Sequence, residues 1–234
     1  MNKVLEDRNH CSNIPAEISA GPAFTLKKMA IWPKSSVQSD QSLDQQNTEL
    51  PSVKFLPISL RKKLSVVTKI SLGLANEVLG NEERAKTPVV MASRHGESGT
   101  ILELLAAVGS DQPGSPMLFS RSVHNASVGL WSIAAKSHAP HISIAAMNFS
   151  FRAGLMEAVL RLHEGEAQVL FVFVDQRLPD EFARFFRNPF EAFGGAFLLT
   201  QGDRLNFNAL FPSTKDPCEA SDFHHFLSVL SKDF

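Results

Sequence analysis

The fold is decided by residues 141–157, HISIAAMNFSFRAGLME. Ile142 and Ile144 alternate with smaller or polar side chains at the strand period, and apolar side chains recur at helical spacing after Ser150. The pattern predicts a buried strand that turns sharply into a helix, with Ser150 as the N-cap. Enzymes often place a nucleophile at such a turn. The residue at this junction is Asn148, whose side chain has no proton to lose and cannot act as one.

Composition places the chain among ordinary globular proteins. Its 234 residues are 44% hydrophobic and 20% charged, which is enough to bury a core. A formal net charge of -1 and a sequence pI near 6.7 provide no field to attract nucleic acid or an anionic membrane surface. Electrostatics therefore favour protein partners or neutral ligands.

The two cysteines and the N-terminus indicate the compartment. Cys11 and Cys218 lie far apart in polar segments, a spacing that is typical neither of a disulfide framework nor of a metal site. No apolar run reaches membrane-spanning length, and the N-terminus lacks the basic-then-apolar order of a signal peptide. We expect a cytoplasmic protein without membrane insertion, metal or cofactor.

Strand-like and helix-like patterns alternate along the rest of the chain. Their order predicts an α/β layered domain with a mixed, mostly parallel central sheet. The run at 168–174 is apolar on both faces, as in strands that helices cover from both sides. The expected strands are 24–32, 88–93, 168–174 and 193–199, and the expected helices are 60–78, 100–108, 126–135 and a terminal one around 223–230.

Polar residues follow the strand predicted at 88–93. Arg94, His95 and Glu97 lie where open α/β sheets gather ligand-binding groups, at the carboxyl end of a strand. No cysteine or metal partner is near them in the sequence. We therefore interpret the segment as a hydrogen-bonded turn and not as a catalytic constellation.

Four blocks of sequence carry a family resemblance. They are APHISIAAMNFS (139–150), ASRHGE (92–97), SPMLFSRSVHNA (115–126) with GLWSIA (129–134), and VDQRLP (174–179). Together they resemble the β-ketoacyl-synthase-like N-terminal proteins, including the chain-length-factor-like subunits of bacterial aryl polyene clusters. The likeness runs from about Phe24 to about Thr200. Asn148 stands where the acyl-accepting cysteine of a ketosynthase would be, and Ser150 matches the serine that follows that cysteine.

The resemblance implies a fold and a function. The fold is the first half of a thiolase-type α/β/α fold. The second half of a ketosynthase supplies two catalytic histidines, and the chain ends before them. The resemblance therefore implies a non-catalytic subunit that forms a heterodimer with an active ketosynthase in fatty-acid or polyketide-type polyene chain elongation. An acyl carrier protein is a second candidate partner. The strand at 142–147 would offer an edge to the ketosynthase, and the missing half would leave one face of the fold uncovered.

The resemblance also selects residues for an acyl tunnel or a partner interface. Side-chain packing alone explains Phe119 and Trp131 equally well. The candidates are Phe119, His124, Asn125, Trp131, Ile142, Ile144, Met147, Asn148 and Phe149.

We expect three segments along the chain. Residues 1–21 form a flexible tail without periodicity, residues 22–211 form the ketosynthase-like domain, and residues 212–234 form a C-terminal helical extension. The polar stretch at 35–52 is expected to be a long loop.

An independent enzyme remains the alternative function. An acyl hydrolase or acyltransferase could use Ser143 or Ser150 as nucleophile and His124 or His141 as base. The chain has no Gly-x-Ser-x-Gly elbow. Ser150 is also better placed as a helix cap, so the partner function is favoured.

Overall fold

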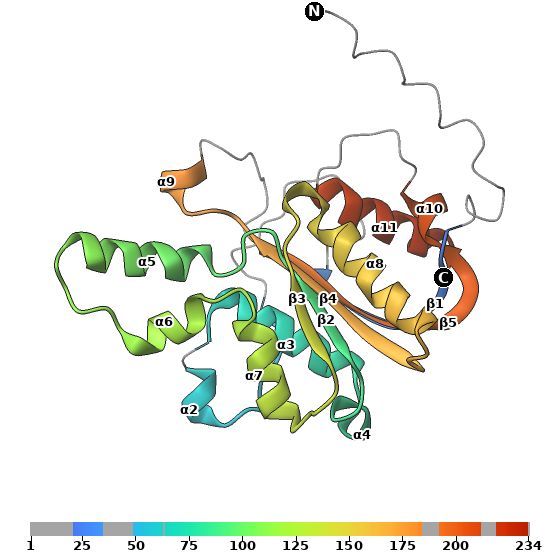
Figure 1. Cartoon of the computed structure of the whole chain (residues 1–234), viewed down its shortest axis with the longest axis horizontal. Coiled ribbons are helices and arrows are strands. Elements are labelled where there is room, and N and C mark those ends of the chain that lie inside the picture. The colour runs from blue at the N-terminus through green and yellow to red at the C-terminus, as the bar shows by residue number, and fades with distance from the viewer. Residues whose placement is uncertain (1–20, 35–48, 63, 184–191, 212–218, 234) are drawn as a thin grey trace, which may run out of the picture.

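The computed structural model describes residues 21–34, 49–62, 64–183, 192–211 and 219–233 (Figure 1). Residues 1–20 of the predicted tail at 1–21 and most of the predicted loop at 35–52 lie outside the described residues. The expected boundary between residues 211 and 212 adjoins another such segment.

The described strands form one five-stranded sheet in the order β1-β5-β4-β2-β3. Strand β2 pairs in parallel with β3 and β4, whereas β5 pairs antiparallel with β4 and β1. The sheet is mixed, as predicted, but it has as many antiparallel pairings as parallel ones. The strands are Ala23–Trp32 (β1), Val89–Ala92 (β2), His141–Ile144 (β3), Gln168–Gln176 (β4) and Ala192–Asn206 (β5).

Helices cover both faces of the sheet (Figure 1). α3 and α7 pack on one face, and α8 and α11 pack on the other. The expectation that one face would be left uncovered is wrong, because α11 folds back beside α8. The helices are Ile58–Arg61 (α2), Val66–Val78 (α3), Asn81–Arg84 (α4), Ser98–Gly109 (α5), Pro116–Ser122 (α6), Ala126–Ala135 (α7), Ser150–His163 (α8), Asp180–Ala183 (α9), Phe207–Leu210 (α10) and Glu219–Asp233 (α11), with a 3-10 turn at Met147–Phe149 (η3).

Strand β4 runs through the middle of the core. Its residues from Val169 to Asp175 are all buried. Successive side chains point to opposite faces of the sheet. Phe171 and Phe173 belong to the core on the α8 and α11 side. Leu170 and Val172 belong to the core on the α3 and α7 side. The sequence prediction of a strand apolar on both faces is confirmed.

Helix α8 lies close to the sheet because of one glycine. A Cβ atom at Gly154 would lie 2.6 Å from the Cβ of Ala92 and 2.6 Å from the ring of Phe171. Such distances are well inside van der Waals contact, so only glycine fits here. The close approach fixes the start of α8, and with it the elbow that joins β3 to α8.

Helix α11 completes the core on the α8 side. Phe223 and Phe226 are fully buried and pack edge-on against Phe197. Arg152 of α8 forms a two-pronged ion pair with Asp222, with N–O distances of 2.6 and 2.8 Å. The predicted terminal helix therefore docks back on the sheet.

Three elements differ from the sequence predictions. The helix expected at 60–78 is two helices, α2 and α3, and the second begins where the Ser65 hydroxyl accepts a bond from the Thr68 amide. α6 was not predicted, although Ser115 caps it and Pro116 occupies its first position. Strand β5 continues past Leu199 to Asn206, because β1 pairs with Thr200 and, after an irregularity in the register, again with Leu205 and Asn206.

Candidate functional site

The elbow between β3 and α8 turns as sharply as the sequence predicts. After Ile144 the chain leaves the sheet and passes through η3 before α8 begins. Met147 has a φ of +52°, a left-handed conformation that costs energy for residues other than glycine. Strain of this kind persists only where the surroundings hold it.

Ser150 holds the elbow in place. Its hydroxyl oxygen accepts a hydrogen bond from the Ala146 amide at 2.9 Å and donates one to the Met147 carbonyl at 2.8 Å. The prediction that Ser150 is the N-cap of α8 is wrong. Ser150 is the first helical residue, and the N-cap is Phe149, without a side-chain cap bond. Because Ser150 is 0% exposed, its hydroxyl has no access to a substrate.

Asn148 lies at the tip of the elbow with its side chain exposed. Its neighbours are apolar and exposed as well: Met147 is 67% exposed and Phe149 is 51% exposed. Instead of a thiol, the elbow presents an amide between two large apolar side chains. An exposed pair of this size is typical of a contact surface.

Strand β3 is an edge of the sheet next to this elbow. It spans His141–Ile144 and ends three residues before the expected edge does at the elbow. Ile142 and Ile144 are half-buried and pack against the core on the α8 side. The opposite edge strand, β1, carries Lys27 and Lys28, whose charges discourage pairing with another strand. β3 has no charged side chain of that kind.

The polar segment after β2 is a hydrogen-bonded turn, as interpreted from the sequence. Asp175, at the end of β4, is buried and accepts from the His95 amide at 3.1 Å. The Nδ1 of His95 lies 3.3 Å from the same carboxylate. The Ser93 hydroxyl accepts from the Gly96 amide at 2.9 Å. These bonds fix the chain between β2 and α5.

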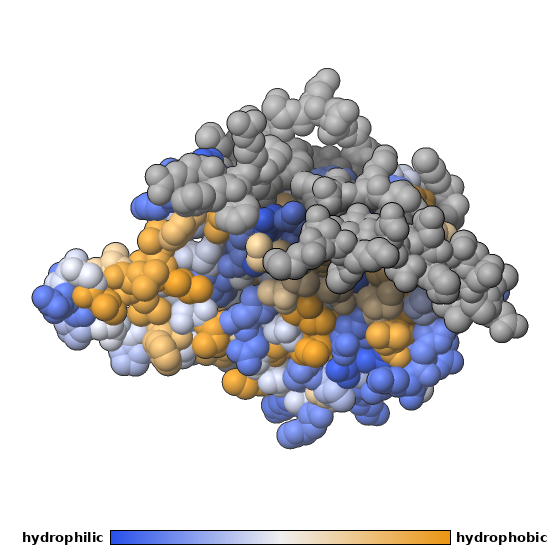
Figure 2. All heavy atoms as spheres, turned by 45° about the horizontal axis from the view of Figure 1, so that its top comes forward, coloured by the Kyte–Doolittle hydropathy of each residue, from blue (hydrophilic) through white to orange (hydrophobic). Residues whose placement is uncertain are grey.

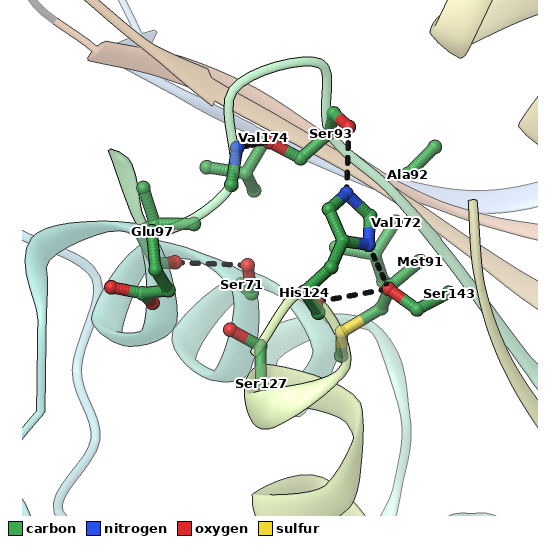
Figure 3. A pocket seen from close by; sticks show the side chains of 12 residues that line it. Ser71, Met91, Ala92, Ser93, Glu97, His124, Ser127, Ser143, Val172 and Val174 are labelled. Carbon is green, nitrogen blue, oxygen red and sulfur yellow. Dashed lines mark hydrogen bonds between the residues drawn. The ribbon is translucent and has the colours of Figure 1, made fainter. Parts of the chain in front are cut away.

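His124 joins three parts of the molecule (Figure 3). Its Nε2 lies 2.8 Å from the Ser93 carbonyl, and its Nδ1 lies 2.8 Å from the Ser143 hydroxyl. A carbonyl only accepts, so Nε2 carries a proton. The Ser143 hydroxyl also lies within 3.1 Å of the His124 carbonyl. The end of β2, the strand β3 and the start of α7 are therefore tied together at one imidazole.

The Ser143 and His124 pair borders a small cavity. Its volume is about 20 Å³, which holds about one water molecule. An acyl thioester does not fit there. The described side chains around the cavity include the carboxylate of Glu97, which accepts bonds from hydroxyl groups and does not orient the imidazole. The distance between His124 and Ser143 is that of a catalytic dyad, but the cavity beside them has no room for a substrate.

The second predicted base, His141, lies at the start of β3. Among the described residues it forms no hydrogen bond with either serine. Burial lowers the pKa of His141 below its ordinary value of 6.5, against the opposing effect of the Pro140 and Ser137 backbone groups. His141 is therefore held in its neutral form.

The other sequence candidates divide into exposed and buried residues. Phe119 on α6 is 68% exposed, and Asn125 is exposed just before α7. Trp131 is 0% exposed and packs edge-on against Phe55, with ring centroids 6.2 Å apart. Core packing therefore accounts for Trp131, which cannot contact a partner in this structure.

The sequence analysis singled out no residue of α5, although Ile101, Leu105 and Val108 are exposed there. It also did not predict α6. The signal for α6 was present in the sequence, because Ser115 is its N-cap and Pro116 occupies its first position.

The described residues offer neither a metal site nor a membrane-spanning helix. No group of three or more His, Cys, Asp or Glu side chains in that part of the chain could hold a metal ion. No helix in it is both long and apolar enough to cross a membrane.

The fold is similar to that of chains in solved ketosynthase structures. A chain of the complex between the ketosynthase ApeO and its chain length factor ApeC from Xenorhabdus doucetiae is 26% identical, with a TM-score of 0.69 over 78% of this chain and 80% of that one. The ishigamide ketosynthase/chain length factor has a TM-score of 0.52 at 16% identity, covering 70% of this chain and 55% of that one. A β-ketoacyl synthase from Burkholderia phymatum STM815 has a TM-score of 0.58 at 11% identity, covering 77% of this chain and 59% of that one.

Sequence comparison identifies the family. No curated protein matches the chain. The family model described as β-ketoacyl synthase, N-terminal domain, matches residues 32–230, which is most of the chain and includes β2, the elbow and most of α11. The match confirms the resemblance and the thiolase-like fold. The chain belongs to the β-ketoacyl synthase N-terminal domain family.

Proposed function

We propose that this chain is a non-catalytic, chain-length-factor-like subunit that forms a heterodimer with an active ketosynthase. The observation that carries the proposal is Asn148 at the tip of the elbow, where the family mounts its acyl-accepting cysteine. Ser150 is buried and Ser143 faces a cavity of about 20 Å³, so neither serine supports an independent acyl hydrolase.

The sheet edge supports pairing with another subunit. Strand β3 is short and uncharged and lies beside the exposed side chains of Met147 and Phe149. An edge strand of this kind offers unpaired backbone groups, and natural proteins usually protect such edges with charge or cover. We infer that the ketosynthase covers β3 and the elbow, and that Ile142, Ile144, Asn148 and the two exposed residues contribute to this interface.

The relatives support the kind of partner. Two of the similar solved structures contain a ketosynthase together with a chain length factor. One of them includes the chain that is 26% identical to this one. From the resemblance of the sequence to the chain-length-factor-like subunits of aryl polyene clusters, we infer that the product is a polyene chain of the fatty-acid or polyketide type. An acyl carrier protein would deliver the chain to the ketosynthase and is proposed as a second, transient partner.

We propose that exposed apolar residues of the elbow and of α6 set the length of the product. If Phe119, Met147 or Phe149 reaches the partner's acyl tunnel, truncation to alanine enlarges the space at its end. The product distribution of the reconstituted pair should then shift to longer chains while the heterodimer persists. An unchanged distribution for all three variants would remove the chain-length role and leave a supporting one.

Co-purification tests the pairing. The tagged chain is expressed with the ketosynthase of the same genome, and the mass of the eluted species is measured by light scattering. We expect a 1:1 heterodimer for the wild type and for Leu160→Asp, a control at a 45% exposed position on α8. Phe149→Asp, at a 51% exposed position, should abolish it. A wild-type chain that elutes alone as a monomer would refute the proposal.

A further inference from the structure

Helices α5 and α6 form a hairpin that projects from the sheet (Figure 1). Apolar side chains gather on this projecting part of the molecule (Figure 2). α5 packs mainly against α6, and Thr100 is its one buried residue. The hairpin is therefore attached to the sheet mainly at its two ends. His124 lies two residues after α6, where its ring contacts Ser93 after β2 and Ser143 of β3 (Figure 3).

The contacts around Ser143 call for more protons than neutral side chains supply. Nε2 of His124 donates to the Ser93 carbonyl at 2.8 Å, so Nδ1 of a neutral imidazole carries no proton and accepts. The Ser143 hydroxyl has one proton but faces two acceptors, Nδ1 at 2.8 Å and the His124 carbonyl at 3.1 Å. When His124 is neutral, one of these two acceptors is left without a hydrogen bond.

A second proton on the imidazole of His124 satisfies all of these contacts. Nδ1–H then donates to the Ser143 oxygen, and the Ser143 hydroxyl is free to donate to the His124 carbonyl. The heavy atoms keep their positions, and only the direction of one hydrogen bond is reversed. The hydrogen bonds made by the imidazole and Ser143 rise from two to three, and those donated by the charged ring are the stronger kind.

A carboxylate borders the same cavity as His124. Glu97 is buried and accepts hydrogen bonds from the hydroxyl groups of Ser65 at 2.6 Å and Thr68 at 2.9 Å. The ion pairs among the described residues do not include Glu97. A Cβ atom at the preceding residue, Gly96, would lie 3.1 Å from the ring of His124. A positive charge on His124 is therefore buried close to a negative charge that has no other cation beside it.

The elements around His124 carry few other charged groups. Asp175 lies 3.3 Å from Nδ1 of His95, with which it pairs, and α7 contains no titratable residue. The remaining charged and titratable groups are Arg94 and His95 in the turn after β2, Asp175 on β4, His141 on β3, Arg121 on α6, Glu103 on α5, and Lys69 and Glu77 on α3.

We propose that His124 and Ser143 form a proton-sensitive latch on the edge strand β3. When Nδ1 gains a proton, the hydrogen bond with Ser143 reverses its direction, and β3 is held more tightly to the end of β2 and the start of α7. His124 is a positioning residue in this role, because it acts on the chain through Ser143. The inference concerns the chain itself and does not depend on the proposed function.

The latch predicts how the opening of β3 depends on pH. The latched form offers the second proton a hydrogen-bond acceptor and a nearby carboxylate, which the opened strand does not. The latched form therefore binds this proton more tightly, and β3 opens less often as the pH falls. Ser143 is separated from the elbow only by Ile144 and Ala145, so the start of the elbow is steadied together with the strand.

Nuclear magnetic resonance of the ring nitrogens tests the proton directly. The full-length wild-type chain is labelled with ¹⁵N-histidine, His124 is assigned by triple-resonance experiments, and the sample is titrated from about pH 8 to about pH 5, the range in which histidine ordinarily changes its charge. We expect a proton on Nε2 throughout and a second proton on Nδ1 at the acidic end. A ring that keeps one charge state over the whole range, or a neutral ring protonated at Nδ1, would overturn the proposal.

Hydrogen exchange of β3 provides the second measurement. Exchange is followed by mass spectrometry on the same chain, corrected for the intrinsic effect of pH, with a peptide from β4 as the internal reference. β3 should open roughly tenfold less often at the acidic end, as expected for one added hydrogen bond to a charged group. Ser143→Ala should remove this dependence. His141→Gln is the matched control on the same strand and should keep it. Equal dependence on pH in the wild type and Ser143→Ala would contradict the latch.

Discussion

The Nδ1 atom of His124 lies 2.8 Å from the hydroxyl oxygen of Ser143, and this contact joins the end of the α5–α6 hairpin to the edge strand β3. In a hydrolase the same distance would activate a nucleophile. Here the hydroxyl faces a cavity of about 20 Å³, so the pair has a structural role at the β3 edge of the sheet.

Ser143→Ala tests this structural role. The substitution leaves Nδ1 of the half-buried His124 without its partner, which should cost about 1–3 kcal/mol of unfolding free energy. Urea denaturation of the isolated chain measures the loss. Ser120→Ala, at an exposed position on α6, should change stability by no more than about 0.5 kcal/mol. Equal stability of the two variants would show that the pair does not support the fold.

His141 gives the chain a predicted dependence of stability on pH. Burial lowers the pKa of His141 in the folded state below 6.5, so the unfolded state binds a proton first as the pH falls. The stabilising contribution is complete above about pH 6.5 and is lost toward the lower folded-state pKa. Denaturation midpoints between pH 7.5 and 5.5 should fall more steeply for the wild type than for His141→Gln. Parallel profiles would contradict the assignment.

Trp131 and Phe119 should respond in opposite ways to truncation. Trp131→Ala removes a fully buried indole from the core and should destabilise the isolated chain by about 3–5 kcal/mol. Phe119→Ala removes an exposed ring and should stay within about 0.5 kcal/mol of the wild type. Thermal unfolding distinguishes them, and a large loss for Phe119→Ala would mean that the ring is part of the core.

Asn148→Cys should not restore condensation. A cysteine at the elbow would supply a nucleophile, but the family model that matches this chain is that of the N-terminal domain, and by the resemblance the histidine pair belongs to the second half of a ketosynthase. The assay follows decarboxylation of malonyl thioester by the purified variant without the partner subunit. Turnover above that of wild type would refute the prediction.

The sequence predicted the central elements because their patterns are local. The unbroken apolar run at 168–174 identified β4 as a strand covered on both faces, and the switch of period at Asn148 located the elbow. The terminal helix was recognised by its spacing of phenylalanines. Each of these signals follows directly from the geometry of a strand or a helix.

The wrong or missing predictions concern contacts that the periodicity of the sequence does not show. The role of Ser150 in bracing the elbow depends on backbone groups at Ala146 and Met147, which local capping rules do not reveal. Nor could the periodicity of α5 show that its apolar stripe faces outward, because the same stripe on another helix faces a core. The docking of α11, which covers the face expected to be bare, likewise depends on tertiary packing.

Intact-mass spectrometry of the co-purified complex tests the central claim most directly. The complex is incubated with an acyl thioester of a carrier protein, denatured, and both subunits are weighed. The account predicts that the ketosynthase carries one acyl group and that this chain, recovered in equal amount, keeps its unmodified mass. A stoichiometric acyl adduct on this chain, at Ser143 or any other residue, would contradict it.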